Sequence, residues 1–338
     1  MGGVLACLAA CGGGGGSTTT NTTTGATATP TANFARGADV GWVTQEEAAG
    51  YVFHDAAGTQ QDPFALLKAH DINAIRLRVW VNPQGGWNGA ADVLAKAQRA
   101  AALGQRIMID FHYSDTWADP GHQTKPAAWA ADDYATLKSD VYTHTHDVLA
   151  TLQQAGITVE WVQVGNEINS GMLWPDGSYQ NFGQLAGLIN SGYDAVKAVY
   201  PDALVVLHLS NGYDNAMYRW FFDGVKAAGA KWDVIGMSHY PPTSGWQSYN
   251  TQIGANMADM VTRYGKPVIV AEVGMDSSQA ATAKAMLTDL IGRVGAQGAN
   301  GLGVFYWEPE AWPGWQGYTM GALDSSGRFT TAMDAFMF

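Results

Sequence analysis

Eight short apolar runs rich in β-branched residues constrain the fold of this chain more than any other feature. They cover residues 37–41, 73–80, 105–111, 159–165, 203–209, 233–238, 267–272 and 302–307. Between them lie Ala- and Leu-rich stretches with helical spacing, several of which end in a glycine that predicts a helix terminus. Eight buried strands that alternate with helices are typical of a closed (β/α)₈ barrel. We therefore predict a single TIM barrel over residues 34–338.

An open, doubly wound α/β sheet is the alternative architecture for such an alternation. It is disfavoured at the first predicted strand, because the sequence GADVGWV that begins at Gly37 contains no GxGxxG phosphate-binding turn.

The first 33 residues have a different composition from the predicted barrel. Residues 12–33 are rich in Gly, Ser and Thr and carry no charge, which predicts a flexible linker. Residues 1–11 resemble a truncated bacterial lipoprotein signal, with Leu8 to Cys11 in the lipobox position. That resemblance implies export, with lipid attachment at Cys11 and a location at the cell surface or outer membrane, or in secreted or periplasmic form.

Charge and cysteine content exclude several classes of function. The chain has 18 Lys and Arg residues against 30 Asp and Glu residues, a formal net charge of −12, and this argues against a nucleic-acid partner. No stretch of about twenty apolar residues is present, which predicts no transmembrane segment. The only cysteines are Cys7 and Cys11, so the predicted barrel has neither a disulfide nor a thiolate metal site.

Polar and aromatic residues gather where the predicted strands end. The active sites of such barrels lie at the carboxyl ends of the strands, so these residues form the candidate site. They are Asp39, Trp42, Arg76, Arg78, Trp80, Asp110, His112, Tyr113, Asn166, Glu167, His239, Tyr240, Glu272, Trp307 and Glu308.

Glu167 and Glu272 follow the fourth and seventh predicted strands, which are nearly opposite staves of a barrel. Glycoside cleavage needs such a pair: an acid that protonates the leaving oxygen, and a carboxylate that attacks or activates water. A gap of about 5–5.5 Å indicates retention of configuration and a wider gap indicates inversion. The other interpretation of either residue is an acid that caps a following helix.

Three neighbours have predicted roles around this pair. Arg78 is expected to lie below Glu272 and keep it ionised, while Tyr240 donates a hydrogen bond to the same carboxylate. Glu167, further from cations, is expected to have a raised pKa and to stay protonated. Asn166 is expected to bind a sugar 2-hydroxyl.

Several longer motifs resemble the bacterial and fungal endo-β-1,4-galactanases, glycoside hydrolase family 53 of clan GH-A, over 34–338. The motifs are GADVGW, IRLRVWVNP (75–83), DFHYSDTWADPGHQTKPAAW (110–129), VQVGNEINSGMLWPDG (162–177), SHYPP (238–242), VIVAEVG (268–274) and GVFYWEPEAWPG (303–314). The resemblance implies retaining endo-hydrolysis of β-1,4-galactan, the side chain of pectic type I arabinogalactan. It implies Glu167 as acid/base and Glu272 as nucleophile. The substrate-binding residues that it implies are Arg78, His112, Asp115, Trp117, Asn166, His239, Tyr240, Trp307 and Trp312.

The resemblance also bears on cofactors and on competing functions. Some bacterial relatives carry a longer segment after the last strand that is associated with calcium, whereas 312–338 is short here, so we expect no metal and no cofactor. We expect a monomer that acts on galactan. A β-1,4-mannanase or β-1,4-glucanase of the same clan stays open as an alternative, and so does a non-catalytic surface carbohydrate-binding protein.

Overall fold

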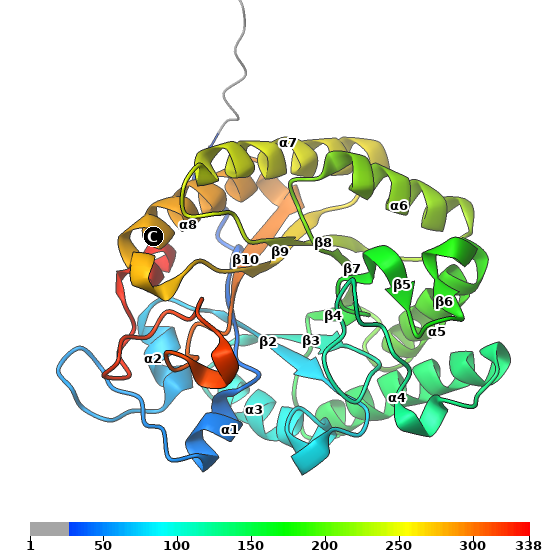
Figure 1. Ribbon diagram of the computed structural model, residues 1–338, viewed down its shortest axis with the longest axis horizontal. Helices are drawn as coiled ribbons and strands as arrows, with labels where there is room; N and C mark the ends of the chain where they lie inside the picture. Colours follow the sequence, from blue (N-terminus) through cyan, green and yellow to red (C-terminus); the bar gives the residue numbers. More distant parts are fainter. Residues whose placement is uncertain (1–26) are drawn as a thin grey trace, which may run out of the picture.

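The computed structural model describes residues 27–338, and in it eight parallel strands close into a barrel surrounded by helices (Figure 1). The predicted lipidation site Cys11 and the linker up to residue 26 lie outside the described residues. Around the barrel the strand order is β1-β10-β9-β8-β7-β4-β3-β2. The TIM-barrel prediction is therefore confirmed.

The bounds of the strands follow the apolar runs of the sequence. They are β1 (Ala35–Asp39), β2 (Ala74–Val79), β3 (Arg106–Phe111), β4 (Trp161–Val164), β7 (Leu204–Leu209), β8 (Val234–His239), β9 (Val268–Val273) and β10 (Gly301–Trp307). A short antiparallel pair, β5 (Gly171–Met172) and β6 (Gly177–Ser178), follows β4. The first strand begins two residues earlier than predicted, because Arg36 takes part in it although it is charged. Its guanidinium lies at the exposed end of the barrel and donates to the carbonyl of Asp71.

In the described part of the chain, eight α-helices form the outer ring of the barrel (Figure 1). They are α1 (Val43–Ala48), α2 (Pro63–Ala69), α3 (Ala90–Ala102), α4 (Tyr134–Gln154), α5 (Phe182–Val199), α6 (Asn215–Ala227), α7 (Trp246–Tyr264) and α8 (Ala280–Gly295). Helices α2, α4 and α6 each begin after an aspartate, Asp62, Asp133 and Asp214, whose carboxylate accepts backbone N–H groups of the first turn. Within residues 27–338 no helix is long and apolar enough to cross a bilayer.

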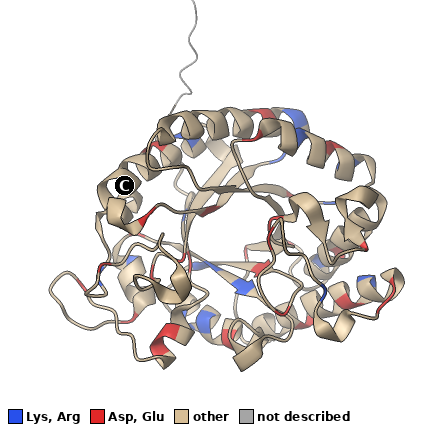
Figure 2. Cartoon of the chain, in the orientation of Figure 1, with Lys and Arg blue, Asp and Glu red and all other residues tan. Residues whose placement is uncertain are grey.

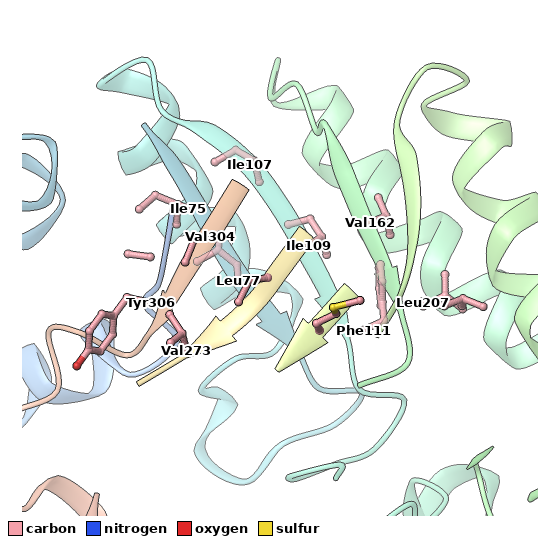
Figure 3. Close-up of a cluster of buried hydrophobic side chains, with 14 of the residues drawn as sticks. Ile75, Leu77, Ile107, Ile109, Phe111, Val162, Leu207, Val273, Val304 and Tyr306 are labelled. Carbon is pink, nitrogen blue, oxygen red and sulfur yellow. The ribbon is translucent and has the colours of Figure 1, made fainter. Parts of the chain in front are cut away.

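Alternating residues of each strand separate an outer core from the barrel interior. In β2, Ile75 and Leu77 belong to the large core between strands and helices, whereas Arg76 and Arg78, which alternate with them, point inward. Figure 3 shows part of this outer core, with side chains of β2, β3, β4, β7, β9 and β10 drawn as sticks. All six residues of β2 are buried, so its alternation of apolar and charged residues separates the outer core from the barrel interior and marks no solvent-exposed face.

The lower part of the barrel interior is filled by one buried apolar cluster. Each of the eight strands contributes one residue, and the eight are Ala35, Ala74, Met108, Trp161, Val206, Val234, Ile269 and Phe305. The rings of Trp161 and Phe305 meet edge to face, with centroids 6.1 Å apart. The barrel is thus packed at this end, and the polar residues of the interior lie on top of an apolar layer.

The chain contacts the barrel from the end of the predicted linker onward. The backbone N–H of Ala28 donates to the carbonyl of Gly292 in α8 at 2.9 Å. The C-terminal 3₁₀ helix, Thr331–Phe336, packs against the same helix. Contacts with the barrel are therefore present ahead of the expected domain start at Phe34.

Candidate active site

A tight backbone turn at the end of β4 carries Glu167 into the mouth of the barrel. Gly165 has φ +80°, and a Cβ there would lie 2.6 Å from the side chain of Ile168. Glu167 itself adopts a left-handed conformation with φ 45° and ψ 52°. A non-glycine residue rarely takes this conformation, and such residues concentrate at functional sites.

Glu167 and Glu272 line one cavity of about 550 Å³ at the carboxyl ends of the strands. Asn166, His112, Trp117, Tyr240 and Trp307 are among the other residues of its wall. Seven of the predicted site residues are thus brought together. Figure 2 shows the charged residues of the strands, including the basic residues of β2, inside the ring of helices.

A larger hollow of about 870 Å³ lies on the outside of the barrel, against α8. The two acidic side chains that line it are already in ion pairs: Asp334 with Lys284 at 3.0 Å, and Asp289 with Arg293 at 2.6 Å. It therefore has no free pair of acids, and the barrel mouth is the better candidate for chemistry.

Arg76 is the cation that holds Glu272, which corrects the prediction for Arg78. Nη1 of Arg76 lies 2.9 Å from Oε1 of Glu272 and 2.6 Å from Oδ2 of Asp39, and Nη2 lies 2.9 Å from Asp110. Arg76 is fully buried, so its charge is balanced by three carboxylates that converge from three strands.

Arg78 lies under the aromatic wall instead of in the cavity. Its guanidinium pairs with Glu308 and lies 4.4 Å from the ring centroid of Trp117. Only 1% of Arg78 is exposed. Both arginines point into the barrel, but the missing side chain of Gly41 leaves room for Arg78 beside β1 and β10, away from Glu272.

The environment of Glu272 favours a carboxylate more than burial alone would allow. The pKa of Glu272 is raised by burial and by the charge of Asp110, and the charge of Arg76 and a hydrogen bond from Tyr240 offset part of that rise. The Tyr240 hydroxyl donates to Oε2 at 2.9 Å, as predicted. One oxygen of Glu272 therefore faces a guanidinium and the other a phenol.

The hydrogen-bonding neighbour of Glu167 is a hydroxyl group instead of a guanidinium. Burial, followed by the charge of Glu272, raises the pKa of Glu167 to about 8, so this carboxyl group is protonated at neutral pH. Oε1 of Glu167 lies 2.6 Å from the hydroxyl oxygen of Ser238, which is within hydrogen-bonding distance. A protonated carboxyl group beside a carboxylate that is paired with a guanidinium is the arrangement that acid and nucleophile roles require.

Asn166 and His112 are fixed by the residues around them. Oδ1 of Asn166 accepts from Nη2 of Arg76 at 3.0 Å, and its Nδ2 donates to the carbonyl of Ala118 at 2.8 Å. For His112, Nε2 lies 3.0 Å from Asp110, while Nδ1 accepts from the indole N–H of Trp80 at 3.1 Å. These contacts orient both side chains at the cavity wall before any substrate arrives.

Tryptophans form one side of the cavity. The ring of Trp307 packs against Trp42, Trp117 and Tyr318, with centroids 5.2, 5.8 and 4.8 Å apart. Such a wall presents an apolar aromatic surface beside the two carboxyl groups.

His239 does not reach the cavity, which corrects its predicted role in substrate binding. It is fully buried, and its Nε2 lies 2.8 Å from Oδ1 of Asn250 in α7. Consecutive residues of a strand face opposite sides, so His239 points to the outer ring of helices while Ser238 and Tyr240 point inward.

Asp115 and Trp312 also lie outside the wall of the cavity. The carboxylate of Asp115 accepts the backbone N–H groups of Asn82 and Ala127, each at 2.9 Å, and so braces the loop after β3. The ring of Trp312 packs against Tyr51 with centroids 5.0 Å apart. Both residues lie in loops, where side chains do not alternate between two faces as they do in a strand. The direction of these two side chains could therefore not be predicted.

The sequence interpretation did not assign Ser238, Gln163 or Asp119 to the site. Ser238 and Asp119 line the cavity, and Gln163 links Asp110 to Arg76 and Asn166 below it. A signal existed for Ser238, which stands two residues before Tyr240 and thus on the same face of β8. Within residues 27–338 no three His, Cys, Asp or Glu side chains are placed to hold a metal ion.

Two glutamates, one shortly after β4 and one in β9, face one cavity at the mouth of a (β/α)₈ barrel, and the one in β9 is paired with a guanidinium. This arrangement defines a glycoside hydrolase. The chain belongs to glycosyl hydrolase family 53, whose sequence model matches residues 35–336. The resemblance seen in the sequence motifs is thereby confirmed.

Individual relatives agree with this assignment. A probable arabinogalactan endo-beta-1,4-galactanase A of Neosartorya fischeri is 36% identical over 303 residues, covering 82% of this chain and 84% of the relative. A solved structure from a study of two fungal beta-1,4-galactanases superimposes with TM-score 0.83 and 31% identity, over 89% of this chain and 98% of the other. The GH53 catalytic domain of Ignisphaera aggregans gives TM-score 0.81 and 30% identity, over 90% and 95%.

Proposed function

We propose that this chain is a retaining endo-β-1,4-galactanase that cleaves galactan and type I arabinogalactan, with Glu272 as nucleophile and Glu167 as acid/base. The observation that carries the proposal is the unlike surroundings of the two carboxyl groups. Glu272 contacts Arg76 and Tyr240, whereas Glu167, which is partly exposed at the cavity, contacts the Ser238 hydroxyl and has a pKa raised to about 8. The family and the names of the relatives support galactan as the substrate.

In the first step Glu272 attacks the anomeric carbon, and Glu167 gives its proton to the departing glycosidic oxygen. The C–O bond to the leaving sugar breaks as the ester bond to Glu272 forms. In the second step Glu167, now a carboxylate, takes a proton from water. The resulting hydroxide attacks the anomeric carbon and releases Glu272.

The change of role of Glu167 follows from the charge of Glu272. That negative charge is one of the causes of the raised pKa of Glu167. Once Glu272 is an ester its charge is gone, so the pKa of Glu167 falls and its carboxylate form becomes stable. The acid of the first step is thereby converted into the base of the second step.

The remaining wall residues are assigned to sugar binding. Trp307 and Trp117 offer apolar ring surfaces for the C–H faces of galactose. Asn166 uses one amide N–H for the Ala118 carbonyl, which leaves the other for the 2-hydroxyl of the sugar at the cleaved bond. His112 lies in the same wall.

Parallel assays of reducing-sugar release from galactan, mannan and carboxymethylcellulose test this proposal. Release from galactan alone is expected. Release from mannan or carboxymethylcellulose would point to the other clan activities, and release from none of the three would point to a carbohydrate-binding protein. Proton NMR of the first products should show the β-anomer, because double displacement retains configuration.

Export, a lipid at Cys11 and a monomeric state are further proposals. The first two rest on the lipobox-like residues 8–11. Mass spectrometry of the mature chain and of Cys11→Ser tests the lipid, and light scattering tests the monomer.

A further inference from the structure

A continuous hydrogen-bonded line of side chains runs from Asn166 to the proposed acid. Nδ1 of His208 lies 2.9 Å from Oδ1 of Asn166, and its Nε2 lies 2.8 Å from the hydroxyl oxygen of Ser238. The same hydroxyl oxygen lies 2.6 Å from Oε1 of Glu167. His208 is fully buried in β7 and does not line the cavity, so it cannot touch a substrate.

The direction of the first bond in this line is fixed. Oδ1 of Asn166 accepts from Arg76, which can only donate, and Nδ2 of Asn166 donates to a carbonyl, which can only accept. The amide of Asn166 therefore cannot be flipped. The nitrogen of His208 that faces Oδ1 must carry a hydrogen.

The direction of the second bond follows from the charge of His208. Burial, together with the charge of Arg76, lowers the pKa of His208 well below its ordinary value, so the ring is neutral. A neutral imidazole with hydrogen on Nδ1 has a lone pair on Nε2. The Ser238 hydroxyl must then give its only hydrogen to His208.

Ser238 consequently turns a lone pair toward Glu167. The two oxygen atoms lie 2.6 Å apart and need a hydrogen between them. A serine that donated this hydrogen would lower the pKa of Glu167, but once the serine hydrogen lies on His208, a protonated Glu167 supplies it instead. If Glu167 were ionised, Ser238 would either face a carboxylate with a lone pair or turn away and leave Nε2 of the buried His208 without a donor. Both arrangements are unfavourable.

We infer that His208, acting through Ser238, is a positioning residue that holds the proton on Glu167 in the resting enzyme. The inference rests on the proposed role of Glu167 as the acid. In the covalent intermediate, where Glu167 is a carboxylate, the Ser238 hydroxyl rotates from His208 to Glu167. The serine thus follows the change of role of the acid.

Other groups around Glu167 and His208 act in parallel and stay in place in the test. The charged and titratable groups that face Glu167 from other elements are Glu272, Arg76, Asp119, Tyr218 and Tyr240. Those that face His208 are Arg76, Asp110 and His112. None of these groups is hydrogen-bonded to the Ser238 hydroxyl. Substitution of Ser238 therefore changes only the hydrogen bonds that join His208 to Glu167.

The test is a titration of the Glu167 carboxyl carbon by ¹³C NMR in the full chain labelled on glutamate side chains, with Glu167→Gln to identify its signal. Ser238→Ala removes the acceptor of the Glu167 proton. His208→Asn keeps a donor for Asn166 but leaves nothing for the Ser238 hydrogen, so that serine is free to donate to a carboxylate. In both variants we expect the ionisation midpoint to fall by about one pH unit, the size of one neutral hydrogen bond.

Two further variants serve as controls. His208→Gln places an amide oxygen near the position of Nε2 and should keep the midpoint of the parent. Ser210→Ala removes a hydroxyl from the same cavity wall that bonds Asn169 and not Glu167, so it too should leave the midpoint in place.

The sign of the shift in Ser238→Ala decides the question. A midpoint that rises would mean that serine normally donates to an ionised Glu167, and an unchanged midpoint would mean that the line has no effect; either result overturns the inference. The midpoints do not depend on activity. If the parent enzyme released no sugar from galactan while both midpoints fell, the proposed function would be wrong and the placement of the proton right.

Discussion

Nη1 of Arg76 lies 2.9 Å from Oε1 of Glu272, and both side chains are buried. The same guanidinium contacts Asp39 and Asp110, so one cation serves three carboxylates that would otherwise repel one another. A group on the second strand therefore favours the charged form of the proposed nucleophile.

Arg76→Gln should both destabilise the fold and shift the pH profile. Loss of one partner of a buried ion pair costs about 3–5 kcal/mol, measured by urea unfolding. Because Arg76 lowers the pKa of Glu272, its removal raises that pKa, and the acidic limb of kcat/KM should move to higher pH. Arg99→Gln is the control, because Arg99 makes its ion pairs near the surface and should lose no more than about 1 kcal/mol. An unshifted acidic limb in Arg76→Gln would contradict this role.

Substitution of the two glutamates should separate their roles. Glu272→Ala is expected to be inactive on every substrate, because no covalent intermediate can form. Glu167→Ala should lose about 10²–10⁴-fold in kcat/KM on galactan, yet keep the rate of the first step on an aryl galactooligosaccharide, whose leaving group needs no proton. Burst kinetics with the aryl substrate measures that step. Equal losses on both substrates would count against Glu167 as the acid.

Glu46 should make the fold less stable as pH rises. It is buried in α1, and burial, followed by the charge of Glu308, raises the pKa of Glu46 to about 8. A raised pKa means that the folded state holds a proton that the unfolded chain releases above about pH 4.5. The stabilisation is complete below that pH and is lost as pH rises through 8.

Glu46→Gln removes this proton while keeping the oxygen that accepts the Trp312 backbone N–H. The fall in Tm between pH 5.5 and 8.5 should therefore be smaller in the variant than in the parent. Glu47→Gln changes the neighbouring residue, which is paired with Arg99 near the surface, and is the matched control. Parallel Tm curves for parent and Glu46→Gln would refute the prediction.

Trp307→Ala and Trp312→Ala should differ although both remove an indole. Trp307 lines the cavity, so its loss should reduce kcat/KM on galactan about 10–100-fold, equivalent to the 1–3 kcal/mol of a buried apolar contact. Trp312 packs against Tyr51 outside the cavity wall, so its loss should lower Tm and leave kcat/KM near that of the parent. A large drop in kcat/KM for Trp312→Ala would place a sugar subsite there.

The fold could be predicted because each apolar run of the sequence is a strand buried on both faces. The positions of Glu167 and Glu272 followed, since both end such strands and all strand ends of a parallel barrel meet at one mouth. The alternation of side chains along a strand also places Ser238 and His239 on opposite faces of β8, although the sequence interpretation did not use it there.

Other details depend on contacts that a single sequence does not contain. Arg76 and Arg78 share parity on β2, and only the space above Gly41 sends Arg78 to Glu308 and leaves Glu272 to Arg76. Asp115 and Trp312 lie in loops, where residue spacing says nothing about direction. The bond between His208 and Ser238 joins two strands and depends on their register.

The apolar layer in the lower barrel has a consequence for how a polymer can be handled. One side chain from every strand is packed into that end, so the barrel interior is closed there and open only at the carboxyl ends of the strands. A polysaccharide cannot pass through the barrel. It must bind across the open end, with both ends of the polymer outside the protein. Bonds remote from the tips of the polymer are then as reachable as those beside them.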